Sequence, residues 1–449
     1  MLIQKQKIYF KSLKNGKSNM ENLIENKLLK ADQAFQEWKK VPFEEKQKLI
    51  AQAAEIFKSK SEIFGEIITS EMNKPISQAI SEVEKCALMM NYYAEAENIL
   101  SPEKIESEYK ISEIHYVPKG VILGVMPWNF PFWQVLRFAT PAILAGNTVV
   151  LKHASICFGS GNAIKKVFIE AGFPEGIFQN LEVGHGEVKE ILEHKTIKGV
   201  SLTGSERAGA EVAAIAGKNI KKSLLELGGS DAFIVLDDAD LDEAAKSGAL
   251  ARLQNCGQTC VAAKRFIIQR DIEFDFLPKF IEEYKKYVPG DPKLKETKLS
   301  GMARPDLADD LEKQYQKALD YGAEAIIPLE RISENEFNPG LIRVEEGNPI
   351  LQEELFGPLG MVMIAENDDD ALEMANNIPF GLSNAVWTKN KERQQFFIDN
   401  LESGTVNINR MTSSDPRFPF GGTKSSGYGT ELSLLALKEF VTAKTILGK

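Results

Sequence analysis

The sequence predicts an α/β protein built on parallel sheets, because helical and strand-like segments alternate along most of its 449 residues. Between residues 160 and 270, short β-rich runs separate stretches whose apolar residues have helical spacing. Residues 22–100 lack such runs and predict helices alone. A chain of this length has room for about three domains.

The N-terminal third predicts helices that lead into a first group of strands. The helices are indicated by apolar spacing near 3.6 residues, and the strands by alternating or continuous apolar runs. The predicted elements are helices over 22–60 with a break at Pro42, helices over 62–100, a strand from Ile111 to Val117, a strand over 121–127, a helix from about Phe132 and a strand over 147–152.

The rest of the chain continues the alternation that is typical of parallel α/β construction. No internal repeat, low-complexity segment or clear linker interrupts it. The predicted elements are helices over 161–172, 206–217 and 273–288, and strands over 198–204, 221–229, 233–237, 265–270, 323–330, 384–389 and 405–409.

Composition narrows the classes of function. The net charge of −10 argues against a nucleic-acid or membrane-surface binder, because both need a positive field. No apolar run reaches the ~18–20 residues that cross a bilayer, and the first twenty residues lack the apolar core of a secretory signal. Only four cysteines are present, which fits a reducing compartment, so the predicted localisation is cytoplasmic.

Cys260, in the segment NCGQTC, is the candidate nucleophile. A thiol attacks only as its thiolate and so needs a partly exposed, electropositive setting, and Gly257 allows a tight turn just before it. The alternative is a small buried side chain, the usual state of a free cysteine. Cys86 and Cys157 are expected in the core, and Cys256 is expected to pack, with a redox partnership as the weaker alternative.

Two more residues suit nucleophilic chemistry. Glu226 ends an apolar strand in LLELGG, where burial would raise the pKa of its carboxyl and make it a general base; the alternative is an ion pair at the strand end. Gly228 and Gly229 would let a backbone or a flat ring approach closely. Asn129 lies between two prolines in MPWNFPFW, and its amide would donate to a developing oxyanion or cap the helix that follows.

Three turn-dense segments are candidates for holding a nucleotide. LTGSERAG places Gly204 and Ser205 between a strand and a helix, where N–H groups can bind a pyrophosphate, although an ordinary turn is the simpler interpretation of this segment alone. Lys152 in LKHAS would bind ribose hydroxyls or a phosphate, or else remain solvated. In EELFGP, Glu354 would accept from a ribose hydroxyl, and Phe356 would wall a flat ring or pack in the core.

Together these motifs resemble the NAD(P)-dependent aldehyde dehydrogenase superfamily. The ordered series is PWNFP, LKHAS, the TGS turn, ELGG, NCGQTC, EELFGP and PFGG, and it covers the chain from about residue 22 to its end. The step of 34 residues from Glu226 to Cys260 also matches. Among subfamilies the sequence is most similar to bacterial succinate-semialdehyde dehydrogenases, on the segments LKHAS and TSSDPRFPFGG. The resemblance implies oxidation of succinate semialdehyde, or a similar short carboxylated aldehyde, with reduction of NADP or NAD.

The resemblance also assigns residues to roles. It implies that Cys260 is the nucleophile, that Glu226 is the base that activates water, and that Asn129 and the N–H of Cys260 form the oxyanion hole. The cofactor-binding residues it implies are Trp128, Lys152, Ser155, Gly204, Ser205, Leu227, Glu354 and Phe356. The substrate-binding residues it implies are Arg137, Ser414, Arg417 and Phe420. No metal site is predicted.

Two positions refine the expected specificity. NAD-preferring members of the superfamily often carry a glutamate where Ser155 stands, and a carboxylate there would repel the 2′-phosphate of NADP. Because Ser155 removes that repulsion and Lys152 and His153 are nearby, we expect NADP to be accepted alongside NAD. Arg137 follows Asn129 by eight residues on the same expected helix face and suits a distal carboxylate, the alternative being a surface ion pair.

Other positions leave the length of the substrate open. Gln254 stands where some relatives carry a second arginine. Ala262 leaves no support for the disulfide switch of other relatives. Glu431 would relay protons or simply begin a helix.

The resemblance implies three domains. These are a Rossmann-type cofactor-binding domain over 1–99 and 119–228, an α/β catalytic domain over 229–425, and a small β extension over 100–118 and 426–449. The extension would build a homodimer or homotetramer. The N-terminal strands usual in the superfamily are expected to be shortened here, which leaves the role of residues 1–20 open.

Three rival interpretations remain. The first is a general aliphatic or betaine-type aldehyde dehydrogenase, against which Arg137 argues. The second is a CoA-acylating relative, which would generally lack a base at the position of Glu226. The third is a non-catalytic ligand-binding or structural relative, against which the joint presence of Cys260, Glu226 and Asn129 argues.

Overall fold

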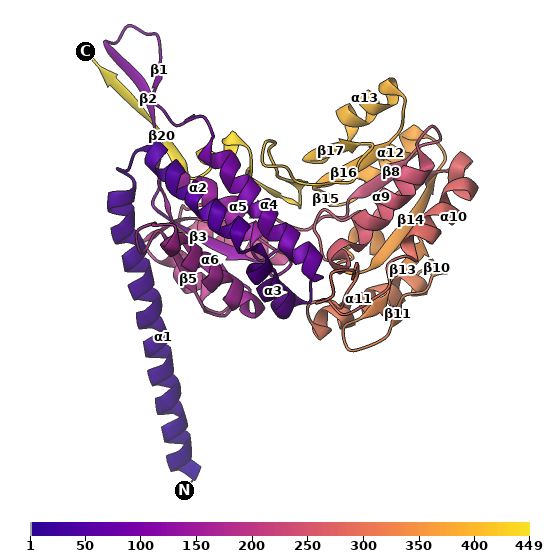
Figure 1. The fold of residues 1–449 in the computed structure, drawn as a ribbon, viewed down its shortest axis with the longest axis horizontal. Helices are drawn as coiled ribbons and strands as arrows, with labels where there is room; N and C mark the ends of the chain where they lie inside the picture. The colour runs from indigo at the N-terminus through magenta and orange to yellow at the C-terminus, as the bar shows by residue number, and fades with distance from the viewer. Residues whose placement is uncertain (1) are drawn as a thin grey trace.

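Two largely parallel sheets, each covered by helices on both faces, form the body of the molecule (Figure 1). The structure is a computed structural model that describes residues 2–449, with side chains from residue 20 onward. A three-stranded antiparallel sheet projects from the N-terminal half. The predicted α/β class is confirmed.

The first sheet has the strand order β19-β7-β6-β3-β4-β5. Its strands are β3 (Val121–Met126), β4 (Thr148–His153), β5 (Phe178–Leu181), β6 (Ile197–Thr203), β7 (Lys222–Glu226) and β19 (Gly427–Tyr428). All pairs are parallel except that of β19 with β7. Strands β4 and β5 are added on one side of β3, and the chain then crosses to place β6 and β7 on the other side of β3. Ligands of open α/β sheets bind where the order reverses in this way, which is here the carboxyl end of β3 and β6.

Both faces of the first sheet are buried because its strands carry apolar residues at consecutive positions. Ile122 faces the core formed with α2 to α6, whereas Val121 and Leu123 face the core formed with α1, α7 and α8. The helices of this half are α1 (Leu2–Trp38), α2 (Phe43–Ser59), α3 (Ser61–Met72), α4 (Ile76–Ala94), α5 (Trp133–Leu144), α6 (Phe158–Glu170), α7 (Val188–Glu193) and α8 (Glu206–Lys218).

The second sheet has the order β10-β13-β14-β9-β8-β16-β17, and only β10 runs antiparallel to its neighbour. Its strands are β8 (Ala232–Val235), β9 (Arg265–Gln269), β10 (Glu324–Ile327), β13 (Gly340–Arg343), β14 (Leu359–Ala365), β16 (Ser383–Trp387) and β17 (Thr405–Ile408). The helices around it are α9 (Leu241–Leu253), α10 (Glu273–Tyr284), α11 (Pro305–Asp320), α12 (Asp368–Asn376) and α13 (Lys391–Asn400).

Short elements complete the chain. The strands of the projecting sheet are β1 (Glu103–Lys104), β2 (Ile111–Pro118) and β20 (Val441–Gly448). Two small ribbons pair β11 (Glu330–Arg331) with β12 (Phe337–Asn338) and β15 (Phe380–Gly381) with β18 (Thr423–Lys424). The 3₁₀ turns are η1 (Ser155–Cys157), η2 (Gln254–Gly257), η3 (Arg270–Ile272), η4 (Pro349–Gln352) and η5 (Leu434–Lys438).

A short link joins the two sheets. Strand β7 ends at Glu226 and β8 begins at Ala232, so the carboxyl end of the first sheet lies next to the amino end of the second. Loops after β3, β6 and β7 therefore meet the segment that leads into β9, which contains Cys260.

The strongest periodic patterns predicted their elements well, and several weaker elements were missed. The predicted break at Pro42 separates α1 from α2. Helix α1 runs back to Leu2 rather than beginning near residue 22, and residue 1 lies outside the described part. The predicted elements did not include β5, β14, α7, α9, or the helices α11 to α13.

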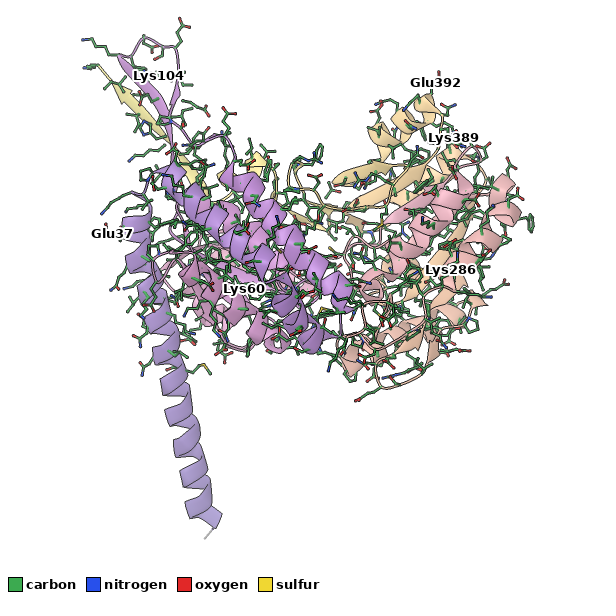
Figure 2. All side chains as sticks on the ribbon, in the orientation of Figure 1. Glu37, Lys60, Lys104, Lys286, Lys389 and Glu392 are labelled. Atoms are coloured by element: carbon green, nitrogen blue, oxygen red, sulfur yellow. The ribbon has the colours of Figure 1, made fainter. Side chains whose placement is uncertain are left out.

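Charged side chains project outward over the surface of both halves, as Lys60, Lys286 and Glu392 do in Figure 2. Within residues 2–449, no helix combines the length and the apolar character that a membrane crossing requires.

Candidate active site

Cys260 lies between two cavities. One has a volume of about 250 Å³ and is lined by predicted cofactor residues: Trp128, Gly204, Ser205, Leu227, Glu354 and Phe356, together with Asn129. The other has a volume of about 200 Å³ and is lined by three predicted substrate residues: Arg137, Ser414 and Phe420. Cys260 and Gln134 line both cavities, so the thiol can be approached from two sides.

A left-handed turn positions Cys260. Asn255, Cys256 and Gly257 have φ angles of 54°, 56° and 70°, a conformation that is costly for residues other than glycine. A Cβ at Gly257 would lie 2.3 Å from the carbonyl oxygen of Gly357. Arg252 fixes the turn from inside by donating to the carbonyl of Gly257 at 3.1 Å. The prediction that Gly257 permits a tight turn before the thiol is confirmed.

The protein environment of Cys260 sets its acidity. Burial raises the pKa of the Cys260 thiol to about 11, while the positive charges of Arg137 and Lys264 act in the opposite direction. The thiol of Cys260 is partly accessible, whereas those of Cys86, Cys157 and Cys256 are buried. This burial favours the protonated thiol of Cys260 at neutral pH.

This acidity predicts the reactivity of the free enzyme. Because only the thiolate reacts, the rate of alkylation by iodoacetamide should rise about tenfold per pH unit between pH 7 and pH 10, below the pKa of about 11. Stopped-time mass spectrometry of the Cys260 peptide measures that rate. Cys260→Ala should leave the protein nearly unlabelled. A rate that is flat across this pH range would contradict the burial argument.

Asn129 is placed to stabilise an oxyanion. Its Nδ2 donates one hydrogen bond to the carbonyl of Gln258 at 3.0 Å, which leaves the second N–H for a ligand. Within residues 20–449, no hydrogen bond occupies the N–H of Cys260, which provides a second donor beside the thiol. The capping alternative for Asn129 is wrong, because Phe132 occupies the N-cap position of α5.

A buried ion pair holds the loop that carries Asn129. Lys74 pairs with Glu82 and donates to the carbonyl of Asn129 at 2.8 Å. The Oε1 of Glu82 accepts from the N–H groups of Phe132 and Trp133 at 2.9 and 3.0 Å, and so caps α5. Sequence reasoning missed this pair, which joins Lys74, in the loop between α3 and α4, to Glu82 on α4.

Glu226 has the environment of a buried base. Both of its carboxylate oxygens are buried and have no hydrogen-bond partner among residues 20–449. Burial, and then the carboxylates of Glu431 and Glu439, raise the pKa of Glu226 well above its ordinary value, against the opposing charge of Arg137. The alternative of a structural ion pair at the strand end is not what the structure shows. Glu226 lines neither cavity and lies within electrostatic reach of Cys260, whose pKa its charge raises.

Arg137 lines the second cavity, of about 200 Å³, which we call the substrate-side cavity. Its charge is already partnered. The guanidinium is buried, pairs with Glu431 through Nε, and lies 4.5 Å from the centre of the Phe420 ring. The alternative of an exposed ion pair is therefore wrong, since both partners are buried. Glu431 is also buried and begins no helix.

Lys152 and Ser155 lie beyond the first cavity, at the carboxyl end of β4. The Nζ of Lys152 is 3.4 Å from Nδ1 of His185, and Ser155 is exposed at the start of η1. His153 points inward instead: its Nε2 contacts the carbonyl of Pro131, and burial lowers its pKa to about 4. The expected help of His153 toward a phosphate is thus wrong, which leaves Lys152 and Ser155.

Glu354 and Ser205 have local partners that orient them. Lys264 donates to Glu354 Oε1 at 3.0 Å, and Gly229 donates to the same oxygen at 3.2 Å. The Ser205 hydroxyl accepts from the N–H of Ala208 and caps α8. Sequence reasoning did not single out Lys264.

Arg417 is the one predicted substrate residue that the structure does not bring to Cys260. Its guanidinium is exposed and pairs with Asp415 at 2.6 Å. Lys85, which sequence reasoning missed, lines the cavity instead. The signal was present: Gln78, Glu82 and Lys85 form a polar stripe at helical spacing on α4.

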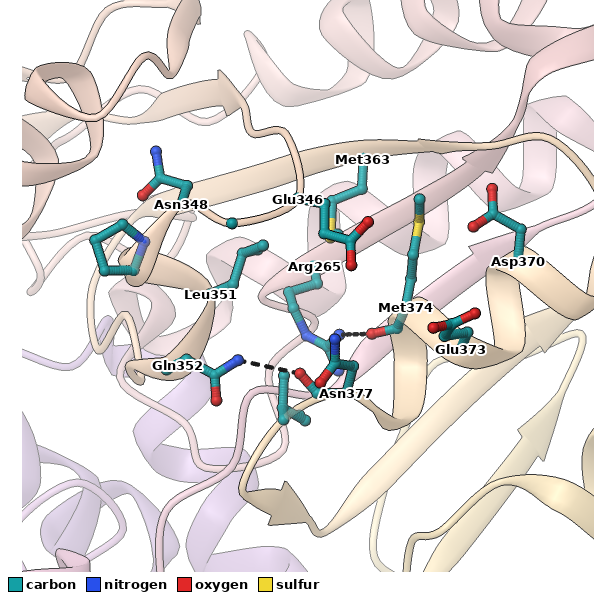
Figure 3. Close-up of a pocket in the computed structure, with 13 residues that line it drawn as sticks. Arg265, Glu346, Asn348, Leu351, Gln352, Met363, Asp370, Glu373, Met374 and Asn377 are labelled. Atoms are coloured by element: carbon teal, nitrogen blue, oxygen red, sulfur yellow. Dashed lines mark hydrogen bonds between the residues drawn. The ribbon is translucent and has the colours of Figure 1, made fainter.

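A further cavity of about 270 Å³ lies away from this site, beside β14 and α12 (Figure 3). Its lining includes Arg265, whose guanidinium donates to the carbonyls of Ser230, Met374 and Ala375. Arg265 therefore has a structural role, because its hydrogen bonds go to backbone carbonyls. None of the predicted site residues lines this cavity.

Comparisons with known proteins agree with this geometry. The model of the "Aldehyde dehydrogenase family" matches residues 13–446. A protein described as probable succinate-semialdehyde dehydrogenase [NADP(+)] from Synechocystis sp. is 44% identical over 427 residues, which cover 94% of each chain. Succinate semialdehyde dehydrogenase [NAD(P)+] of Escherichia coli is 40% identical over 94% of this chain and 92% of its own.

A solved structure is similarly close. The crystal structure of succinic semialdehyde dehydrogenase from Streptococcus pyogenes in complex with NADP+ superposes with a TM-score of 0.91 at 37% identity, and the match covers 94% of each chain.

Proposed function

The chain belongs to the aldehyde dehydrogenase family, and from this premise we propose that it oxidises succinate semialdehyde, or a similar short carboxylated aldehyde, to the acid with NADP or NAD. The observation that carries the proposal is the position of Cys260 between two cavities, one walled by nucleotide-type residues and the other bordered by the cationic side chains of Lys85 and Arg137. The names of the most similar relatives point to the same substrate.

The residues of the first cavity fit a dinucleotide. The cavity opens at the reversal point of the first sheet, where Gly204 and Ser205 precede the N-terminus of α8. The rings of Trp128 and Phe356 meet edge to face with centres 5.8 Å apart and form an apolar wall. Glu354 would accept from a ribose hydroxyl. Lys152 and Ser155 would hold a 2′-phosphate, which supports NADP as a cofactor.

The chain's own groups supply the remaining chemistry. The Cys260 thiolate would attack the aldehyde carbon, while Asn129 Nδ2 and the N–H of Cys260 donate to the oxygen that gains charge. The nucleotide, when bound, supplies the acceptor for the hydride that leaves this adduct as it becomes a thioester. Glu226 would then take a proton from water, whose oxygen attacks the thioester and releases the acid and the Cys260 thiolate.

The same proposal covers the wider organisation. We place the cofactor-binding domain at 1–99 and 119–228, the catalytic domain at 229–425 and the oligomerisation extension at 100–118 and 426–449. The projecting sheet β1-β2-β20 supports a homodimer or homotetramer, because its open edges can pair with a second copy. Four free cysteines support a cytoplasmic location.

A substrate panel tests the proposal. Initial rates are measured for three- to six-carbon semialdehydes and for butanal, each with NADP and with NAD. We expect the highest kcat/KM with succinate semialdehyde. A kcat/KM for butanal equal to or above this value would favour a general aldehyde dehydrogenase, and formation of an acyl-CoA in the presence of CoA would favour an acylating enzyme. Absence of NAD(P)H formation with every aldehyde would favour a non-catalytic relative.

Cofactor choice has its own test at Ser155. Ser155→Glu should weaken NADP binding by about 100-fold, because a carboxylate beside the 2′-phosphate repels it, and should change NAD binding by no more than about twofold. Dissociation constants are measured by titration of the apoenzyme, with the exposed Ser107→Glu as the matched control. An unchanged ratio of the two constants would remove Ser155 from the cofactor site.

A further inference from the structure

Lys85 on α4 borders the substrate-side cavity, on the same lining as Cys260. Its Nζ donates to the hydroxyl of Ser414 at 2.8 Å and lies 4.4 Å from the centre of the Trp133 ring. The ammonium is thus held in place by a neutral oxygen and an aromatic face. An ammonium has three N–H donors, so two remain for a ligand.

The charges of this cavity are unequally compensated. Three charged side chains line it: Glu82, Lys85 and Arg137. Glu82 pairs with Lys74, and Arg137 pairs with Glu431 through Nε, while the Nη2 of Arg137 has no hydrogen-bond partner among residues 20–449. Among the side chains of residues 20–449, no carboxylate lies within ion-pair distance of Lys85. A half-buried cation without an anion is costly unless a ligand supplies the anion.

The acidity of Lys85 agrees with this geometry. Burial, and then the nearby charge of Arg137 on α5, lower the pKa of Lys85 to about 8. Cys86 and Glu82 on α4, and Asp415 in the segment after β17, act in the opposite direction and do not restore it. A carboxylate bound next to Lys85 would favour its charged form and raise that pKa.

We infer that Lys85, with the hydroxyl of Ser414, binds the distal carboxylate of the semialdehyde and so selects carboxylated over neutral aldehydes. Arg137 remains paired with Glu431 and contributes positive charge beside the thiol. The inference rests on the proposed function and names the residue that recognises the carboxylate of the substrate. Gln254, on the same lining, carries no charge and so cannot form an ion pair with the carboxylate.

The decisive variants are Lys85→Met and Lys85→Arg. Lys85→Met keeps an unbranched apolar side chain against Trp133 and removes the charge. We expect kcat/KM for succinate semialdehyde to fall by about 100-fold, mainly through KM, because a charged hydrogen-bonded partner is lost. The value for butanal should stay within about twofold, and Lys85→Arg should retain most of the preference. The exposed Lys48→Met is the matched control.

A binding measurement avoids turnover altogether. Succinate, the expected product, should protect Cys260 of the wild-type protein from iodoacetamide, and Lys85→Met should lose that protection. The preference for succinate semialdehyde over butanal should also decline in the wild type as pH rises through about 8, since Lys85 then loses its proton. In Lys85→Met the ratio should not vary with pH.

The outcomes separate the two claims. Equal losses with both aldehydes, or an unchanged preference in Lys85→Met, would overturn the role of Lys85 while leaving the proposed function intact. A wild-type protein with equal kcat/KM for butanal and for succinate semialdehyde would overturn both the role of Lys85 and the proposed substrate. Selective loss of the carboxylated substrate together with lost succinate protection would support the inference.

Discussion

Replacing Cys260 by alanine or serine should lower the rate of NADPH formation by about 10⁴-fold or more, the scale seen when a covalent nucleophile is removed. A serine hydroxyl does not substitute, because it is far less acidic than a thiol and so supplies far less of the anionic nucleophile. Initial rates with succinate semialdehyde and saturating NADP measure the loss.

Binding provides the control for this variant. Cys260→Ala removes only a sulfur atom from the wall of a cavity of about 250 Å³. The variant should therefore bind NADP with nearly the wild-type dissociation constant. Unchanged binding with lost turnover would assign the loss to chemistry. A serine variant that turned over at the wild-type rate would show that the aldehyde is not attacked by residue 260.

Replacing Glu226 by glutamine should separate the two halves of the reaction. The thioester should still form, giving one NADPH per active site in a rapid burst, and steady turnover should then fall by about 10²–10⁴-fold because water lacks its base. Because the pKa of Glu226 is raised by burial, its basic form accumulates as pH rises, so wild-type hydrolysis of the thioester should accelerate with pH. Glu226→Gln should lose this dependence.

Two controls protect that interpretation. Hydroxylamine attacks a thioester without a general base, so it should restore turnover in Glu226→Gln but not in Cys260→Ala. Thermal unfolding should show a folded variant, although a buried amide without partners costs about 1–3 kcal/mol. Absence of the burst would place Glu226 before thioester formation and contradict its proposed role.

The elements that were predictable from the sequence were those whose pattern is local. The break at Pro42 and the strand over 121–127 follow from a proline and from an uninterrupted apolar run. The helix α9 and the strand β14 were missed. Helix α9 has weak apolar periodicity because many of its apolar positions are alanines, whereas β14 is an apolar run like that over 121–127 and was passed over beside its turn-rich neighbour segment.

The site was predictable where a residue acts alone and unpredictable where its role depends on a distant partner. Cys260 and Asn129 were singled out from their motifs and line one cavity, and Glu226 lies within electrostatic reach of Cys260; their catalytic roles stay predictions. The partnership of Arg137 with Glu431 joins residues far apart in sequence, and that of Lys74 with Glu82 joins a loop residue to the helix α4. Lys85 was overlooked because it is distinguished by having no carboxylate partner among the described residues, and this can be recognised only in the three-dimensional structure.

The turn at residues 255–257 limits how this enzyme can be redesigned. At position 257 a methyl group would already collide with the carbonyl of Gly357, and the two preceding residues hold a backbone conformation that β-branched side chains resist. Mutational libraries that aim at new aldehydes will therefore gain variety on the walls formed by α4 and α5, while residues 255–257 tolerate almost no diversity.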